Sequence, residues 1–410
     1  MQLRRHVAHA LLRAASRLFA TLGIALLSIQ AAPAQDPLAD PGFVHFYNNE
    51  YDRALTDFRQ ELKAHPNDPE IYNHIAQTLL YREMFRDGVL ESQLVTGSNP
   101  FLRRPKMEME PADRANLLDC IKKSIQLSQA QLKSNPEDAG ALYALAVAHG
   151  LRANYLFLIE HSWMDALREA TAARKADQSV LRLDPGFIDG QLILGLNEYV
   201  VGSLPFYLRA MGFIGGFHGD KEAGIRHLQN VARFGTMNRY DAKILLAVIY
   251  RREHRPAEAI PILQALAGIF PRNYLFRFEQ VQMYSDLGDK RAALRVLDEV
   301  SALRQKNAPG YTQIPAEKIA YLRGNLLFWY GDLDPALANL ETATRNPSEV
   351  DLNTAVMAWL RLGQVYDLRG SHEQAVHAYR QTIKTAPGSD IAAEARNYIA
   401  NPYRRKRISG

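Results

Sequence analysis

The sequence contains a single cysteine, Cys120, among its 410 residues. One cysteine cannot form an intramolecular disulfide, so the fold must be stabilised by packing. The surrounding residues, DCIKKS, include no histidine that could activate the thiol, and we expect a small buried apolar residue rather than a nucleophile. Hydrophobic residues make up 47% of the chain, which is ample for a sizeable core at this length.

An excess of positive charge is confined to the two ends of the chain. The formal net charge is +5, but Arg4, Arg5, Arg13, Arg17 and the segment YRRKR (403–407) together supply eight positive charges, and the body between them is slightly acidic. This distribution argues against a basic face for nucleic acid, and we expect no nucleic-acid partner. The tail is expected to be a solvated terminus, with at most peripheral contact to a membrane or an acidic partner.

Long hydrophobic runs are missing as well. The main apolar stretch, LFATLGIALLSI (18–29), is too short to span a bilayer comfortably. It follows an arginine-rich start and precedes the small residues Ala32 and Ala34, which is the layout of a secretory signal peptide. We therefore expect residues 1–34 to be a signal peptide that is cleaved after Ala34, and the mature protein to be periplasmic or secreted.

Motifs for catalysis and cofactors are lacking. The glycine-rich GFIGGFHGDK (212–221) does not contain the Gly-Lys-Ser/Thr sequence that closes a phosphate-binding loop. No His-x3-His or His-Glu-x2-His set indicates a metal site, and no Gly-x-Ser-x-Gly motif indicates a hydrolase. We expect no enzymatic activity, no cofactor and no metal.

Patterns typical of strands are absent too, whereas a helical repeat is prominent. The segment AWLRLGQVYDLRGSHEQAVHAYRQTIKTAPGS (358–389) resembles the tetratricopeptide repeat, a 34-residue pair of antiparallel helices. The resemblance rests on Trp359, Leu362, Gly363, Tyr366, Gly370, Ala375, Tyr379 and Pro387. The small signature residue recurs at Ala54, Ala259, Ala293 and Ala336, and Ala259 and Ala293 are 34 residues apart. We predict an all-α fold: a right-handed α-solenoid of about seven such hairpins, with one insertion rich in glycine and aromatic residues.

The spacing of these signatures divides the mature chain. Residues 35–236 are predicted to form degenerate repeats, with an insertion at 202–219. Residues 237–389 are predicted to form a regular array, residues 390–400 a capping helix, and residues 401–410 a basic tail.

The insertion is located by two small signature residues. Such residues lie 12 positions apart in the repeat, but Gly195 and Gly224 lie 29 apart, so about 17 residues are inserted within one hairpin. Ser203 is expected to cap a short helix that includes Pro205, and Asp220 to cap the helix that follows.

The inserted segment, GSLPFYLRAMGFIGGFHGDKEAG (202–224), also resembles a particular group. It is similar to the hallmark segment of the inclusion-body-clearance and repeat-protein-39 family of tetratricopeptide proteins, and to bacterial exported repeat proteins. The match rests on Gly202, Ser203, Leu204, Pro205, Gly216, Phe217, Gly219, Asp220 and Gly224 and covers about 60 residues around the insertion. The eukaryotic members have no such signal peptide, so the resemblance implies an architecture and a binding function, not a cellular role.

Two interpretations of the insertion remain open. Its apolar side chains either fold into the concave side of the solenoid and fill it, or form a lid or docking element for an apolar ligand, a peptide or a membrane surface. These side chains are Leu204, Phe206, Tyr207, Met211, Phe213 and Ile214.

The resemblance to tetratricopeptide proteins also implies a peptide-binding groove on the concave face, formed by the first helix of each hairpin. The positions that match the family's groove are Ile244, Val248, Arg251, Phe278, Gln282, Ser285, Tyr321, Asn325, Phe328, Leu360, Gln364 and Asp367. Aromatic and amide side chains on successive hairpins suit an extended peptide. The carboxylate-binding variant of this groove is not evident, because Tyr321 stands where that variant has lysine.

These observations predict an exported, non-catalytic scaffold or adaptor that binds a protein or peptide partner. Two alternatives are a carrier of an apolar small molecule or lipid beneath the insertion, and a regulatory subunit of an envelope enzyme.

Overall fold

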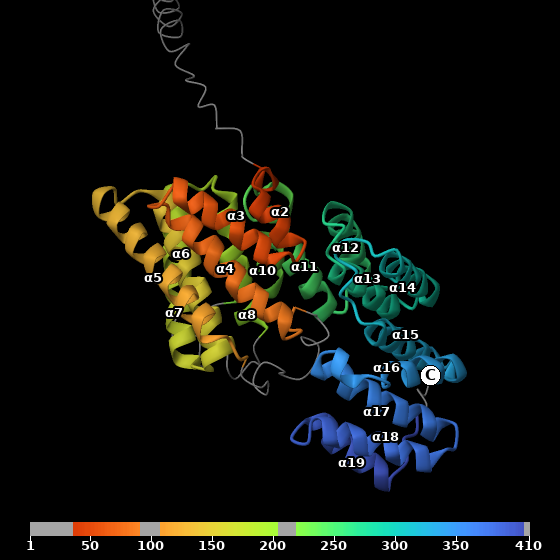
Figure 1. The fold of residues 1–410 in the computed structure, drawn as a ribbon. Coiled ribbons are helices and arrows are strands. Elements are labelled where there is room, and N and C mark those ends of the chain that lie inside the picture. Colours follow the sequence, from red (N-terminus) through yellow and green to blue (C-terminus); the bar gives the residue numbers. More distant parts are fainter. Residues whose placement is uncertain (1–35, 91–106, 204–218, 406–410) are drawn as a thin grey trace, which may run out of the picture.

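The computed structural model describes residues 36–90, 107–203 and 219–405, and every regular element in these ranges is helical (Figure 1). The predicted all-α solenoid of helical hairpins is confirmed for this part of the chain. The predicted signal peptide, the last residues of the tail and the insertion residues Leu204, Phe206, Tyr207, Met211, Phe213 and Ile214 lie outside the described residues.

The helices of the described ranges form eight consecutive hairpins, one more than expected. They are α2 (Pro41–Tyr47) with α3 (Tyr51–Ala64), α4 (Pro69–Arg86) with α5 (Pro111–Ser134), α6 (Ala139–Tyr155) with α7 (Trp163–Leu183), α8 (Gln191–Gly202) with α10 (Lys221–Phe234), α11 (Arg239–Arg252) with α12 (Pro256–Ile269), α13 (Leu275–Leu287) with α14 (Lys290–Gln305), α15 (Ala316–Tyr330) with α16 (Leu333–Ala343), and α17 (Leu352–Leu368) with α18 (His372–Thr385). A final helix, α19 (Asp390–Ala400), packs on α18.

The repeat signature acts through close packing within each hairpin. A Cβ atom on Gly363 would lie 2.4 Å from the ring of Tyr379, so only glycine lets α17 approach α18 over this side chain. Tyr379 is completely buried there. Gly370, in the turn between the two helices, has a φ of +79°, which glycine adopts without steric cost. The predicted roles of these three residues are confirmed.

The first hairpin packs against the fifth, which the repeat pattern did not predict. The Tyr47 hydroxyl donates a hydrogen bond to Asp241 Oδ2 over 2.7 Å, and the Tyr47 ring lies 5.5 Å from that of Tyr240. The loop after α12 extends this contact, because Asn273 Nδ2 donates to the Tyr47 carbonyl over 2.8 Å. Helices α2 to α12 therefore form a closed unit, here called the N-terminal lobe, and α13 to α19 form the C-terminal array.

The hydrophobic core follows this division rather than the change in repeat regularity. One cluster of buried side chains runs from Phe46 to Met283 and includes α11 and α12, which the sequence assigned to the regular array. A second cluster begins at Phe278 and serves the array. The change from closed lobe to open array thus occurs near α13, later than the predicted boundary at residue 236.

Within the described ranges, one segment, Ala139–Glu160, is long and apolar enough to cross a membrane, but 44% of its most apolar window is buried inside the lobe. Ala144, Ala146 and Ala148 lie in the core, so a role as a core helix accounts for its composition. Cys120 is also buried, and burial raises the pKa of its thiol to about 11, in keeping with the apolar role expected for it.

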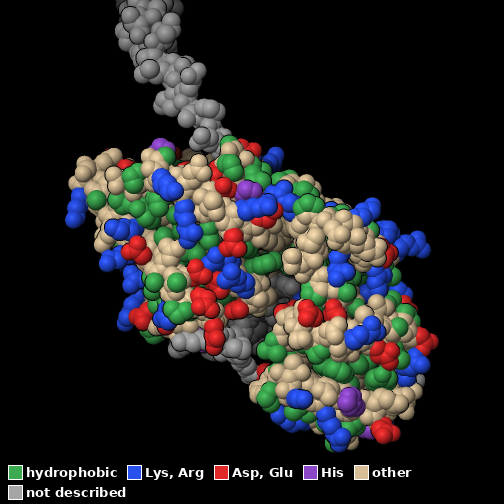
Figure 2. Space-filling view, viewed as in Figure 1, with side chains coloured by type: hydrophobic (Ala, Val, Ile, Leu, Met, Phe, Trp, Pro, Cys, Tyr) green, Lys and Arg blue, Asp and Glu red, His purple; other side chains and the backbone are tan. Residues whose placement is uncertain are grey.

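Charged side chains are mixed over the face seen in Figure 2. Lysine and arginine are interspersed with aspartate and glutamate on both the lobe and the array, without one large patch of either sign.

Candidate peptide-binding groove

A cleft of about 500 Å³ opens between the C-terminal ends of α13 and α15 in the array. Three predicted groove residues, Gln282, Ser285 and Asn325, line it. The remaining lining residues are Asp286, Leu287, Gly288, Leu326, Trp329 and Tyr330. The structure therefore brings together side chains from two successive hairpins that sequence reasoning had placed on one concave face.

Two large apolar side chains of this cleft are exposed to solvent. Trp329 is 56% exposed and Leu287 is 50% exposed. Such residues at the edge of a polar cleft are typical of binding surfaces, where tryptophan in particular contributes much of the binding free energy. Neither residue was predicted from the sequence, although Trp329 directly follows the predicted groove residue Phe328 and Leu287 lies two residues after Ser285.

A buried arginine connects this cleft to the next hairpin. Arg361, on α17, is only 7% exposed and donates hydrogen bonds to Asn325 Oδ1 over 2.9 Å and to Gln364 Oε1 over 2.6 Å. Its guanidinium also lies 4.6 Å from the ring centroid of Phe328 and 4.7 Å from that of Trp329. Burial lowers the pKa of Arg361, although at ordinary pH an arginine stays charged.

These contacts fix what the cleft can offer to a ligand. Because the carbonyl oxygen of Asn325 accepts from Arg361, this side chain presents N–H donors. Asp286 supplies an exposed carboxylate, and Trp329 and Leu287 supply apolar area. A peptide in an extended conformation has matching carbonyl acceptors, N–H donors and side chains.

The next step along the array is covered by the C-terminal tail. The predicted groove residue Asp367 has no exposed side-chain surface, and its Oδ2 accepts hydrogen bonds from Tyr379 Oη and from the backbone N–H of Tyr403, both over 2.7 Å. Phe328, completely buried, lies beneath Arg361 and next to Tyr403. Gln364 is buried beside them.

The assignment of Phe278, Tyr321 and Leu360 to the open groove was wrong. All three are buried in the hydrophobic clusters of the array. Phe278 and Tyr321 lie about one helical turn before the lining residues Gln282 and Asn325, where the first helix packs against neighbouring helices rather than facing the groove.

The remaining predicted groove residues lie on α11, outside the array. Ile244 and Val248 are half-buried, and Ile244 packs against the core of the lobe. Arg251 is buried and forms an ion pair with Glu279 over 3.0 Å. None of the three lines the cleft between α13 and α15.

A second cleft, of about 530 Å³, lies at the loops before α4 and α6. Two of its three carboxylates have structural tasks, since Asp68 accepts from the Glu70 backbone N–H and Asp138 from that of Ala141, both over 2.9 Å. These are ordinary helix caps, and they make this cleft the weaker candidate.

The two ends of the insertion meet within one hairpin, as predicted. A Cβ atom on Gly219 would lie 2.3 Å from the backbone nitrogen of Gly202, so the two backbones touch. Asp220 caps α10 as expected, accepting from the N–H groups of Glu222 and Ala223. Ser203 ends α8 instead, and its hydroxyl donates to the Tyr199 carbonyl over 2.7 Å.

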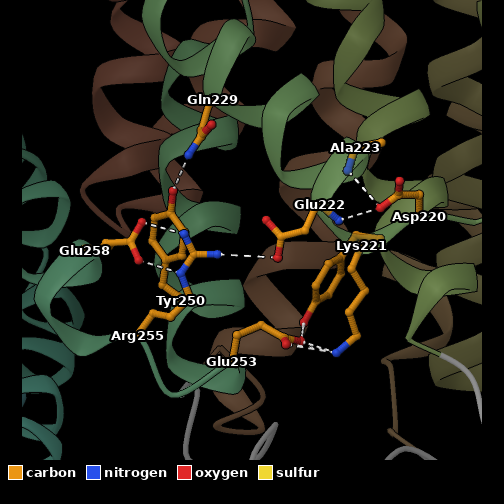
Figure 3. A network of polar contacts seen from close by, with 10 residues as sticks. Asp220, Lys221, Glu222, Ala223, Gln229, Tyr250, Glu253, Arg255 and Glu258 are labelled. Carbon is orange, nitrogen blue, oxygen red and sulfur yellow. Dashed lines mark hydrogen bonds and ion pairs between the residues drawn. The ribbon is translucent and has the colours of Figure 1, made fainter.

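A network of hydrogen bonds and ion pairs connects the residues that flank the insertion, Tyr199 and Lys221, to the end of α11 (Figure 3). Glu253, after α11, accepts from Lys221 Nζ over 2.7 Å and from the Tyr199 hydroxyl over 2.8 Å. Burial acts to raise the pKa of Glu253, but these hydrogen bonds outweigh it and lower the pKa. Arg255 joins the network through Glu258 and, at 3.7 Å, Glu222. The ends of the insertion are thus held firmly.

Comparison with known proteins agrees with the repeat assignment in the array. The family model described as "Tetratricopeptide repeat" matches residues 321–390, which cover most of α15 and all of α16 to α18. No curated protein sequence matches the chain.

Several solved structures are similar in outline. Yeast Tom70 is 11% identical, with 89% of this chain and 88% of that chain covered and a TM-score of 0.39. The human IFIT1 dimer with m7Gppp-AAAA is 14% identical, with 87% and 78% covered and a TM-score of 0.42. YrrB, described as a TPR protein with an unusual peptide-binding site, is 16% identical, with 66% and 97% covered and a TM-score of 0.32.

Proposed function

We propose that this chain is an exported, non-catalytic scaffold that binds a protein partner through an extended peptide segment in the cleft between α13 and α15. The observation that carries the proposal is the exposure of Trp329 and Leu287 beside the amides of Gln282 and Asn325. Export is proposed from the layout of residues 1–34.

The apolar surface of Trp329 and Leu287 is unfavourably exposed to water when no partner is bound. An exposed tryptophan gains free energy when a partner covers it, and the neighbouring amides supply the hydrogen bonds that fix the direction of a peptide. The cleft lies beside and partly within the segment that matches the tetratricopeptide repeat.

The test is crosslinking in intact cells with tagged protein, followed by mass spectrometry of what co-purifies. Trp329→Ala should reduce capture of the partner at least about tenfold, as expected for a central aromatic contact. Leu352→Ala is the matched control, because Leu352 is equally exposed, also belongs to the array and does not line the cleft.

Equal capture by the wild type and Trp329→Ala would contradict the proposed site. Recovery of lipid without a protein partner would favour the alternative of a carrier beneath the insertion.

A further inference from the structure

The basic tail does not simply extend into solvent. After α19 the chain turns back, and residues 402–405 lie against the C-terminal ends of α17 and α15. This position is next to the open cleft. The tail contacts Phe328, and the following residue of α15, Trp329, lines the cleft.

Tyr403 makes the contacts expected of a bound peptide. Its backbone N–H donates to Asp367 Oδ2 over 2.7 Å, a hydrogen bond that any non-proline residue could make. Its ring lies 6.0 Å from that of Phe328 and 5.3 Å from that of Tyr398, the latter in an edge-on arrangement. The side chain therefore selects an aromatic group, while Asp367 recognises the main chain.

Arg405 adds a contact two residues further on. Its guanidinium lies 5.0 Å from the ring centroid of Phe328 and donates to the Phe328 carbonyl, close to the end of α15. A helix C-terminus favours a cation, and an aromatic face adds to the attraction.

The same site contains a reason for weak binding of the tail. Arg361 already holds its guanidinium 4.6 Å from the Phe328 ring, so two like charges share one aromatic side chain. Arg404 and Arg405 remain largely exposed, and the tail is anchored mainly through Tyr403. A segment held in this way can be displaced by a competitor with additional contacts.

We infer that the groove recognises peptides with an aromatic residue followed two positions later by arginine, and that residues 402–405 occupy this site when no partner is bound. The inference rests on the proposed function and names the class of partner. A peptide docked in place of the tail could continue from Phe328 into the cleft, where Asp286 provides a carboxylate for a further basic residue.

The test uses a fluorescent peptide with the sequence NPYRRKR, corresponding to residues 401–407, and full-length proteins. Fluorescence anisotropy should show binding to the double variant Tyr403→Ala, Arg405→Ala, and binding to the wild type weaker by about tenfold or more, because the wild-type site is occupied. The peptide NPARRKR has the same charge and should not bind the double variant. Tyr403→Phe keeps the ring and should behave as the wild type.

Thermal unfolding of the variants shows whether they fold, and Arg405→Ala alone is the milder substitute if the double variant does not. Equal binding of the peptide to wild type and variant, equal binding of both peptides, or no binding at all would overturn the inference. So would a concentration-dependent dimer that is lost on Tyr403→Ala, because the tail would then dock on a second copy.

The proposed function can fail or survive separately. Partner capture that depends on Trp329 but is insensitive to excess NPYRRKR would leave the scaffold function standing and reject this ligand class. Capture that is insensitive to Trp329→Ala would reject the scaffold site whatever the peptide does.

Discussion

The N-terminal lobe and the C-terminal array are built from the same kind of hairpin, but the helices of the lobe close on themselves and the described helices of the array do not. In the lobe the first hairpin returns to the fifth, and Tyr47 and Asp241 from opposite ends of the unit hydrogen-bond to each other. In the array no such return occurs among the described helices, and Trp329 remains exposed. When the first and last hairpins of a solenoid are in contact, as in the lobe, the surface between them is no longer accessible to a ligand. An array whose ends do not meet leaves that surface open as a groove.

The two parts contain largely buried aspartates whose pKa values are shifted in opposite directions. In the lobe, burial raises the pKa of Asp177 to about 7 and that of Asp241 to about 6. In the array, burial acts to raise the pKa of Asp351, but the charge of Lys318 and hydrogen bonds from Lys318 and Thr354 lower it. The contributions of Asp177 and Asp241 to stability should therefore depend on pH with the opposite sign to that of Asp351.

The largest effect is expected from Asp351→Ala in the array. This carboxylate accepts from Lys318 Nζ over 2.7 Å and caps α17 through the Thr354 N–H over 3.0 Å. Removing one member of a largely buried ion pair costs about 3–5 kcal/mol of unfolding free energy. Urea unfolding should show the loss, and hydrogen exchange should place it in α15 and α17.

Asp334→Ala is the matched control, because the ion pair of Asp334 with Arg369 is at the surface and should contribute little. In the wild type the contribution of Asp351 is present at neutral pH and is lost as the pH falls through its lowered pKa. Faster exchange in the lobe rather than the array would contradict the division.

Asp177→Asn should have the second-largest effect, and it should be stabilising. Asp177 is completely buried on α7, so its folded-state pKa of about 7 lies above that of the unfolded chain. Its contribution to stability is fully present below the pKa of an unfolded aspartate, about 4, and is lost as the pH rises from there through the folded-state pKa of about 7. At pH 8 the variant should gain up to about 4 kcal/mol, the equivalent of three pKa units.

The measurement is urea unfolding at pH 5 and pH 8. Asp165→Asn, on the exposed side of the same helix, should leave the pH dependence of the wild type unchanged. A variant at Asp177 that is less stable than the wild type at pH 8 would show that the carboxylate is charged and stabilised there.

The hairpins were predictable because their determinants are local. Gly363 and Tyr379 lie 16 residues apart, and Asp220 caps the helix that begins at the next residue. Closure of the lobe was not predictable from the sequence. Tyr47 and Asp241 are 194 residues apart, and they meet only because the small rotations between several successive hairpins add up. The spacing of residues within one repeat does not determine this total rotation.

The groove was predictable in part for the same reason. Gln282 and Asn325 follow from the repeat, but Phe278 and Tyr321 show that an aromatic residue one turn earlier packs inward. The involvement of Arg361 depends on contacts between hairpins, which one repeat does not reveal.

The smallest of these effects is expected from Asn273→Ala, which weakens the closure of the lobe. Asn273 Nδ2 donates to the Tyr47 carbonyl, and Asn273 Oδ1 accepts from Asn49 Nδ2 over 2.7 Å and from the Leu275 N–H over 3.0 Å. Leaving these buried groups without a partner should cost about 2 kcal/mol. Hydrogen exchange should quicken in α2 and remain unchanged in α17.

Asn339→Ala is the control, because the Asn339 side chain donates a solvent-exposed hydrogen bond within its own helix, to the Pro335 carbonyl. The lobe should loosen rather than open in Asn273→Ala, since the Tyr47 ring still packs 4.9 Å from Phe270 and its hydroxyl still reaches Asp241. Unchanged exchange in α2 would mean that these aromatic contacts hold the first hairpin without Asn273. Faster exchange in α17 would mean that the closure of the lobe also supports the array, and the two parts could then no longer be treated as independent.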